Sequence, residues 1–358
     1  MDWAPIKLTT HIRTYAFGER LIPGMLGKTG VPASGRVAET WEFSDEKGAR
    51  ATITEGPYAG RPLNDLVRDH PDGLVGFGWR GPHFPLLGKF LDASHMLPVH
   101  LHANDADAAR IYGHPNGKSE AWHILWCAPG ATILTGIKPG NTDDTLRAAF
   151  RAEDYERVMY RHPLRPGDTV HVPGGILHSF GPDTLIYEIQ QTSDLAQTVM
   201  PADLDGNRLP DAVWEANIDK TLAELHQDYL PIPNPGLEKA QGPGGNRFRV
   251  CCAGPHFALE RWSLAGPHAE PARPRRCLTL SNVGDPVAVR WQGGETVLAR
   301  AESCILPAAI GETVIVPSGA GDLIACYVPD VQADVIDPLR AAGHADAAIA
   351  ALGEVFPG

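Results

Sequence analysis

"LRPGDTVHVPGGILHSF", residues 164–180, has a partial copy in "AAIGETVIVPSGAGDLI", residues 308–324. Both contain G-[DE]-T-V-x-V-P-x-G, in which alternating apolar residues indicate a strand and the proline and glycines indicate a tight turn. The copies differ at one chemically important position, because the second has Asp322 where the first has His178. The repeat therefore predicts two similar β units, each closed by a glycine turn and a strand, of which only the first carries this histidine.

Short strand-like runs between turn signals fill most of the chain on both sides of a segment rich in Pro and Gly. Many short strands at even spacing predict a mainly β fold with two barrels or sandwiches. Helix signals at 141–160, with Thr142 as the cap, and at 210–227 predict helical insertions. We expect a first domain at 1–227, a Pro/Gly-rich linker at 228–246, a second and degenerate domain at 247–330, and a C-terminal helix within 331–358, capped by Asp337.

The composition narrows the class of partner. The chain has 358 residues and a formal net charge of −12, and its short basic run at 273–276 is broken by proline. These features disfavour nucleic acid. No apolar run reaches the roughly 18 residues of a membrane span, and the N-terminus lacks the apolar part of a secretory signal. The six cysteines contain no CxxC pair. We expect a reduced, soluble, cytoplasmic protein that acts on a small molecule, while the oligomeric state stays open.

A candidate metal site joins the first copy of the repeat to "VHLHANDADAARIYGHPNGKSE", residues 99–120. His100 and His102 have the period of two that places both on one face of a strand. Segment 167–178 fits G-x5-P-x-G-x2-H, the second sequence motif of the cupin barrels, and the HxH pair resembles the beginning of the first. Ligands of such barrels point inward from neighbouring strands. The resemblance implies two cupin-type β-barrels, or jelly rolls, with His100, His102, Glu120 and His178 around one divalent ion.

Imidazole and carboxylate ligands suit several metals. Zinc is the first expectation, with Mn, Fe, Co and Ni as alternatives. The competing interpretation is a barrel that has lost its metal and satisfies its histidines by hydrogen bonds. The second half, with no HxH and no histidine at the turn, illustrates that state.

Longer stretches of the chain resemble the type I mannose-6-phosphate isomerases in their shorter bacterial form. The resemblance extends from about residue 36 to 200 and, more weakly, to about 330. It is carried by "AETWEFSD" (38–45), "FPLLGKFLDA" (84–93), "NGKSEAWHIL" (116–125) and residues 164–194. It implies a metal-dependent isomerase of sugar phosphates, in which the ion polarises the sugar oxygens while a base moves a proton between C1 and C2.

The resemblance also assigns roles to residues of this chain. The family's metal ligands are Gln, His, Glu and His, so His100 stands where the family has glutamine. Lys118 and Glu188 are the expected catalytic residues, and the alternative role of Glu188 is to orient its neighbours. The expected substrate-binding residues are Lys118, Trp41 and Arg208. Trp41 would line the pocket together with Glu39, and Arg208 would reach the pocket from a rearranged loop.

Two departures from the family change the expected substrate. Pro98 replaces a serine near the phosphate, and Thr198 replaces an arginine ten residues after Glu188. Proline has no N–H to offer an anion, and threonine has no charge. We therefore expect an aldose–ketose isomerase that acts on an altered or unphosphorylated sugar. The alternatives are a non-catalytic sugar-binding or regulatory cupin and an Fe(II)-dependent cupin oxygenase.

Overall fold

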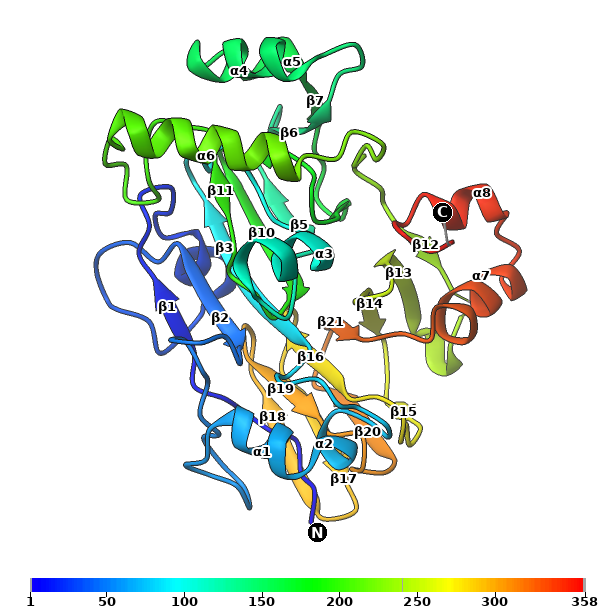
Figure 1. The fold of residues 1–358 in the computed structure, drawn as a ribbon. Helices are drawn as coiled ribbons and strands as arrows, with labels where there is room; N and C mark the ends of the chain where they lie inside the picture. Colours follow the sequence, from blue (N-terminus) through cyan, green and yellow to red (C-terminus); the bar gives the residue numbers. More distant parts are fainter. Residues whose placement is uncertain (1, 240, 357–358) are drawn as a thin grey trace.

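Strands dominate the structure, a computed structural model that describes residues 2–239 and 241–356. They form four antiparallel sheets, two in each half of the chain (Figure 1). The six-stranded sheet of the first half has the order β1 (His11–Arg13), β2 (Glu39–Phe43), β3 (Leu86–Ala93), β10 (Thr184–Gln191), β5 (Glu120–Cys127) and β8 (Thr169–Val172). Its five-stranded sheet has the order β11 (Gln197–Thr198), β4 (His100–Leu101), β9 (His178–Ser179), β6 (Thr132–Ile137) and β7 (Met159–Pro163).

The second half repeats this arrangement with one strand fewer. Its six-stranded sheet has the order β12 (Leu237–Glu238), β13 (Arg247–Ala253), β14 (Ala258–Leu264), β21 (Gly321–Tyr327), β16 (Leu278–Asn282) and β19 (Ser303–Leu306). Its four-stranded sheet has the order β15 (His268–Glu270), β20 (Thr313–Pro317), β17 (Val287–Trp291) and β18 (Gly294–Leu298). Position by position, β8 therefore corresponds to β19 and β9 corresponds to β20.

This strand order corrects the register of the sequence repeat. The repeat aligns β8 with β20, but β8 belongs to a six-stranded sheet and β20 to a four-stranded one. The shared pattern marks a strand followed by a glycine turn, which occurs at more than one place in such a fold. Asp322 is consequently not the structural counterpart of His178. The predicted barrels are also not confirmed, because pairing among the described strands leaves four separate sheets.

The central strands of the first six-stranded sheet are buried on both faces. All eight residues of β3 and of β10 are buried, and Lys89 lies directly opposite Glu188 in their register. Successive side chains of a strand point to opposite faces. Glu188 therefore points to the inside of the first half, while its neighbours Tyr187 and Ile189 point to a core shared with the second half.

That shared core joins the two halves of the molecule. One apolar cluster contains Phe90 and Tyr187 from the first half and Phe257, Ile324 and Cys326 from the second. The Ser281 hydroxyl also donates a hydrogen bond of 3.1 Å to Tyr187 Oη. All six cysteines are buried free thiols. The sheet that carries Glu120 and Glu188 is thus supported from behind by the second half.

Helices cover the outer face of the five-stranded sheet. Figure 1 shows α6 (Asp211–Glu224) across the end of the first half, with α4 (Asp143–Arg151) and α5 (Tyr155–Val158) beyond it. Apolar residues of these helices, among them Phe150 and Trp214, pack with Leu101 and Leu134 of the sheet. The other α-helices of the described residues are α1 (Leu63–Asp69), α2 (Pro71–Leu74), α3 (Asp105–Asp107), α7 (Asp337–Ala341) and α8 (Asp346–Ala350), and short π- or 3-10-helical segments lie at Ile22–Leu26, Ala108–Tyr112, Pro243–Gly245 and Val331–Ile336. No helix of the described residues has the length and apolarity needed to cross a bilayer.

Two predicted helices are divided in the structure. Thr142 caps α4 as expected, but the helix ends at Arg151, and Glu153 follows with a φ of 53°. The C-terminal region forms separate helical turns, and Gly343, with a φ of 91°, lies between α7 and α8. A left-handed residue ends an α-helix, and apolar periodicity alone does not reveal where one will occur.

Candidate metal centre

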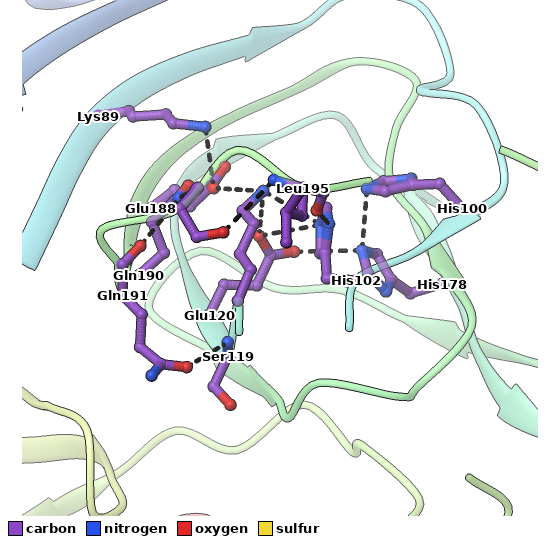
Figure 2. A network of polar contacts seen from close by, with 12 residues as sticks. Lys89, His100, His102, Ser119, Glu120, His178, Glu188, Gln190, Gln191 and Leu195 are labelled. Atoms are coloured by element: carbon purple, nitrogen blue, oxygen red, sulfur yellow. Dashed lines mark hydrogen bonds and ion pairs between the residues drawn. The ribbon is translucent and has the colours of Figure 1, made fainter. Parts of the chain in front are cut away.

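Four side chains from the two sheets of the first half meet in its interior (Figure 2). His100 in β4 lies opposite His178 in β9, His102 follows β4, and Glu120 begins β5 in the facing sheet. One potential ligand atom of each lies within 4.8 Å of the others. His178 Nε2 is 3.0 Å from His100 Nε2 and 3.1 Å from Glu120 Oε1. The predicted ligands His100, His102, Glu120 and His178 are therefore brought together.

Main-chain carbonyl oxygens fix the tautomers of the three histidines. The Nδ1 atoms of His100, His102 and His178 each lie 2.7 Å from a carbonyl oxygen, of Pro98, Leu195 and Ile176 respectively. A carbonyl oxygen can only accept, so each Nδ1 carries a proton, and in the neutral form of the ring Nε2 keeps its lone pair. Holding one ring nitrogen in this way is how proteins orient metal-binding histidines.

The resulting set of lone pairs fits a cation. The rings of His100 and His178 face each other through their Nε2 atoms, and Glu120 Oε1 adds an anionic oxygen. Glu120 Oε2 is buried and accepts no hydrogen bond, and its nearest cation is the Lys118 ammonium, 2.9 Å away. Acceptors that face one another at contact distance repel unless a proton or metal ion lies between them. The chemistry of the donor set therefore fits a divalent ion.

Burial keeps His100 and His102 neutral. Burial, followed by the neighbouring charges of His178 and His102, lowers the pKa of His100 well below its ordinary value. Burial and the Lys118 ammonium lower the pKa of His102 to about 4. Burial acts to raise the pKa of Glu120, but Lys118 and His102 outweigh it and hold this pKa well below the usual range. At neutral pH His100 and His102 are thus neutral imidazoles and Glu120 is a carboxylate, the forms that bind metals.

A chain of buried ion pairs extends from this cluster (Figure 2). Lys118 Nζ lies 2.9 Å from Glu120 Oε2, 3.1 Å from His102 Nε2 and 3.6 Å from Glu188 Oε1. On the far side of Glu188, Lys89 Nζ lies 3.2 Å away and is also 3.8 Å from Glu39 Oε2. Lysine ammonium groups and carboxylates therefore alternate along this chain.

The expected catalytic residues Lys118 and Glu188 both belong to this chain. Burial raises the pKa of Glu188 to about 7, against the opposing charge of Lys89. Burial acts to lower the pKa of Lys89, but Glu188 and Glu39 outweigh it and raise this pKa. Lys89 stays a cation at neutral pH, whereas Glu188 can gain or lose a proton there.

A cavity of about 300 Å³ opens onto this network. Its lining includes the side chains of Lys118, Glu188, Lys89 and Glu39 and the ligand candidates His100, His102 and Glu120. Two residues expected to bind substrate lie elsewhere. Trp41 is buried behind the wall, where its indole N–H donates to Glu39 at 2.6 Å. Arg208 is exposed and lies 3.4 Å from Asp211.

The sequence interpretation did not single out several cavity residues. Lys89 was visible as a lysine within the apolar run "FPLLGKFLDA", and a charge in a buried strand is itself a signal of a functional site. Trp122 could have been inferred from its spacing of two residues from Glu120. Asp194 and Asp203 also line the cavity, but they come from an irregular segment that carries no pattern.

Comparison with known proteins finds relatives among the mannose-6-phosphate isomerases. No protein-family model matches the chain. YvyI of Bacillus subtilis, provisionally named a mannose-6-phosphate isomerase, is 27% identical over 330 residues, which cover 92% of this chain and 100% of YvyI. Mannose-6-phosphate isomerase ManA of the same organism is 28% identical over 233 residues, covering 65% of this chain and 72% of ManA. The crystal structure of the mannose 6-phosphate isomerase from Bacillus subtilis has a TM-score of 0.79 at 24% identity, over 90% of this chain and 99% of that one, a likeness of fold.

Proposed function

Because this chain is a divergent relative of the mannose-6-phosphate isomerases, we propose that it is a metal-dependent sugar isomerase that interconverts an aldose and a ketose. The observation that carries the proposal is the convergence of three oriented imidazoles and one carboxylate at the end of a cavity large enough for a monosaccharide. Each half of the chain is, in this proposal, a cupin-type unit, which the matching strand orders support. The domain boundaries expected from the sequence form part of the proposal.

In this proposal His100, His102, Glu120 and His178 hold one divalent ion, zinc in the first place and Mn, Fe, Co or Ni as alternatives. When bound, such an ion supplies a Lewis acid that polarises the carbonyl and hydroxyl oxygens of a sugar. Among the described residues, no second group of this kind occurs. The expected stoichiometry is therefore one ion per chain.

Glu188 is the proposed proton carrier. Isomerisation moves one proton from C2 to C1 and one from O2 to O1, so it needs no external oxidant or reductant. A group that takes and returns a proton works best when its pKa is near the ambient pH, and burial raises the pKa of Glu188 to about 7. The Lys118 ammonium, beside Glu188 in the cavity, would stabilise negative charge on the oxygen of the enediolate.

The proposed substrate is a sugar with altered or absent phosphorylation. Pro98 and Thr198 line the cavity where the resemblance expects a serine and an arginine. Thr198 donates its hydroxyl to the carbonyl oxygen of Val99 at 3.3 Å, so it does not replace a cationic donor. Trp41 contributes through Glu39, and Arg208 would reach a substrate only after its loop rearranged, because its guanidinium is exposed.

Deuterium exchange at C2 tests the isomerase. The full-length protein, loaded with zinc, is incubated in D₂O with mannose, fructose, a pentose and mannose 6-phosphate, and NMR follows label at C2 and the appearance of the isomer. We expect exchange with at least one of these sugars. His178→Ala should lose both stoichiometric metal, measured by elemental analysis, and exchange.

The matched control is His100→Gln, which should retain metal because the amide oxygen is also a ligand. Absence of exchange from the metal-bound wild type with every sugar would refute the isomerase. Sugar binding without exchange would then support a non-catalytic binding protein, and oxygen consumption with Fe(II) would support an oxygenase. Stoichiometric metal in His178→Ala would show that the ligands are assigned wrongly.

A further inference from the structure

The cavity beside the candidate metal centre is rich in carboxylates. Five acidic side chains line it, of Glu39, Glu120, Glu188, Asp194 and Asp203, together with two lysines and no arginine among the described residues. Glu120 belongs to the proposed ligand set, so the negative charge that a substrate would meet away from the ion comes from the other four. Asp194 is exposed and Asp203 is half-buried, which places both at the outer part of the cavity.

Both cavity lysines are already engaged by carboxylates. Lys118 Nζ lies 2.9 Å from Glu120 and 3.6 Å from Glu188, and Lys89 Nζ lies 3.2 Å from Glu188 and 3.8 Å from Glu39. A phosphate group would have to compete with these buried anions for each ammonium. Neither lysine is therefore a free cation at the outer end of the cavity.

The remaining side-chain donors of the described lining, those of Tyr15, Trp122, Thr198 and Asn217, carry no charge to hold an anion. Pro98 has no N–H, and the hydroxyl of Thr198 donates to Val99 while it accepts from the main-chain N–H of Met200 at 3.1 Å. Phosphate sites in proteins combine several N–H donors with Arg, Lys or a helix N-terminus. Carboxylates are acceptors only, and the hydroxyl groups of a sugar are donors that suit them. The lining thus matches a neutral polyol.

We propose that this cavity takes an uncharged sugar, and that Asp194 and Asp203 are the specificity residues that exclude a phosphorylated one. The proposal rests on the proposed sugar isomerase for the class of ligand. Asp203 also orders its own loop, since its side chain accepts from the main-chain N–H groups of Asp205 at 3.0 Å and Asn207 at 2.8 Å. Replacement of Asp203 by asparagine keeps an acceptor oxygen for this turn while it removes the charge.

Apolar side chains supply the second half of the recognition. The cavity that Asp194 and Asp203 line is also lined by apolar side chains, those of Phe17, Leu97, Leu204 and Leu209. Sugar rings present C–H faces as well as hydroxyl groups, so a pocket with apolar walls and a few placed acceptors fits an unmodified monosaccharide. A phosphate on the same ring would be moved out of water into this acidic and partly apolar surrounding, which is unfavourable for a dianion.

Calorimetric titration of the full-length, zinc-loaded protein with mannose and with mannose 6-phosphate tests the charge preference. We expect the wild type to bind mannose more tightly, by about tenfold or more. In the double variant Asp194→Asn/Asp203→Asn this ratio should shrink about five- to tenfold, the size expected for a dianion near two carboxylates in screened water. Asp205→Asn, which removes an exposed charge of the same loop outside the cavity lining, should leave the ratio unchanged.

Equal or tighter binding of mannose 6-phosphate by the wild type would overturn the proposal, as would no measurable binding of mannose or an unchanged ratio in the double variant. Deuterium exchange measured on the same samples separates this outcome from failure of the isomerase. If deuterium exchange occurs but mannose is not preferred over mannose 6-phosphate, the assignment of the specificity residues is wrong and the isomerase proposal stands. If mannose is preferred but no deuterium exchange occurs, the isomerase proposal is wrong and the assignment of the cavity to an uncharged sugar stands.

Discussion

Three imidazoles at the end of the cavity are oriented by main-chain carbonyl oxygens rather than by other side chains. The sequence pointed to His100, His102 and His178 through their spacing and a turn motif, and these side chains do meet in the structure. Their role as metal ligands stays a prediction. The carbonyls of Pro98, Ile176 and Leu195 could not be predicted, because main-chain atoms leave no trace in a residue pattern.

The charged residues around the candidate metal ligands were harder to predict from the sequence than the ligands themselves. Lys89 and Glu188 face each other because two strands distant in sequence pair in one register. That register depends on the whole sheet, so neither residue alone reveals the pair. Asp194 and Asp203 lie in segments without periodicity, and only the folded loop brings them to the cavity.

The raised pKa of Glu188 predicts a pH dependence of stability for the metal-free protein. The folded state holds a proton on Glu188 up to about pH 7, whereas the unfolded chain releases it near 4.5. Between these values the folded state binds more protons, so this group makes the free energy of unfolding fall as pH rises. Glu188→Gln should remove that contribution, by about 1–3 kcal/mol between pH 5 and 8.

Urea denaturation of wild type and Glu188→Gln in EDTA, at a series of pH values, measures this difference. Comparison with the variant is necessary because His102, whose pKa is lowered to about 4, contributes with the opposite sign. Relative to wild type, the glutamine variant should become more stable as pH rises. A difference in stability that is independent of pH would show that Glu188 does not titrate in this range.

At the scale of single elements, the cap at Thr142 was predicted correctly, whereas the cap at Asp337 and the interruptions of the helices were not. Asp337 is the first residue inside α7 and caps nothing, because a helical turn at Val331–Ile336 leads directly into that helix. Thr142 was predicted as a cap, and it accepts from the Thr145 N–H while Thr145 Oγ1 accepts from the Thr142 N–H. The helix beyond it was predicted too long, because the left-handed Glu153 ends it. The sequence repeat aligns β8 with β20 instead of β19 because the same strand-and-turn pattern occurs at several places in the fold. Which sheet a strand joins depends on its hydrogen-bonded neighbours, and the pattern does not contain that information.

Removal of the cap of α4 should destabilise the molecule without changing the metal centre. Thr142→Ala deletes one acceptor for the helix N-terminus, which typically costs about 1 kcal/mol. The helix is anchored through Leu146, Ala149 and Phe150 on the outer face of the five-stranded sheet, so the loss should appear in the global unfolding free energy. Urea denaturation measures it, and Thr142→Ser, which keeps the hydroxyl, is the control. A change of metal stoichiometry in Thr142→Ala would contradict this separation.

At the scale of the whole molecule, the two halves share one apolar core. The sequence indicated two β units, but it could not show that their six-stranded sheets pack against each other, since a strand buried on both faces has no polar face to reveal its neighbours. A core common to both halves implies that they unfold together.

Phe257→Ala tests this coupling. Phe257 is 1% exposed and lies in the shared cluster, so its truncation should cost about 3–5 kcal/mol. Tryptophan fluorescence and circular dichroism should still report a single coincident transition. Val297→Ala, at a residue 48% exposed, should change stability by less than about 0.5 kcal/mol. Two separate transitions would show that the halves fold independently.

The strand orders of the two halves correspond except for β11, which has no counterpart in the second half, and this is what a tandem duplication followed by divergence would leave. In the second copy, β15 takes the place of the strand that carries His100, and it too begins with a histidine. There, however, the rings of Phe248 and Trp262 lie 4.7 and 5.2 Å from the ring of His268. In the second half, whose interior is filled in this way, only packing limits which substitutions are tolerated. The first half must also preserve the charged residues of the cavity and the access to it. In homologous sequences, the interior of the second copy should therefore vary by exchange of apolar residues of similar size. Residues around the cavity of the first copy should vary by changes of charge or hydrogen-bonding type.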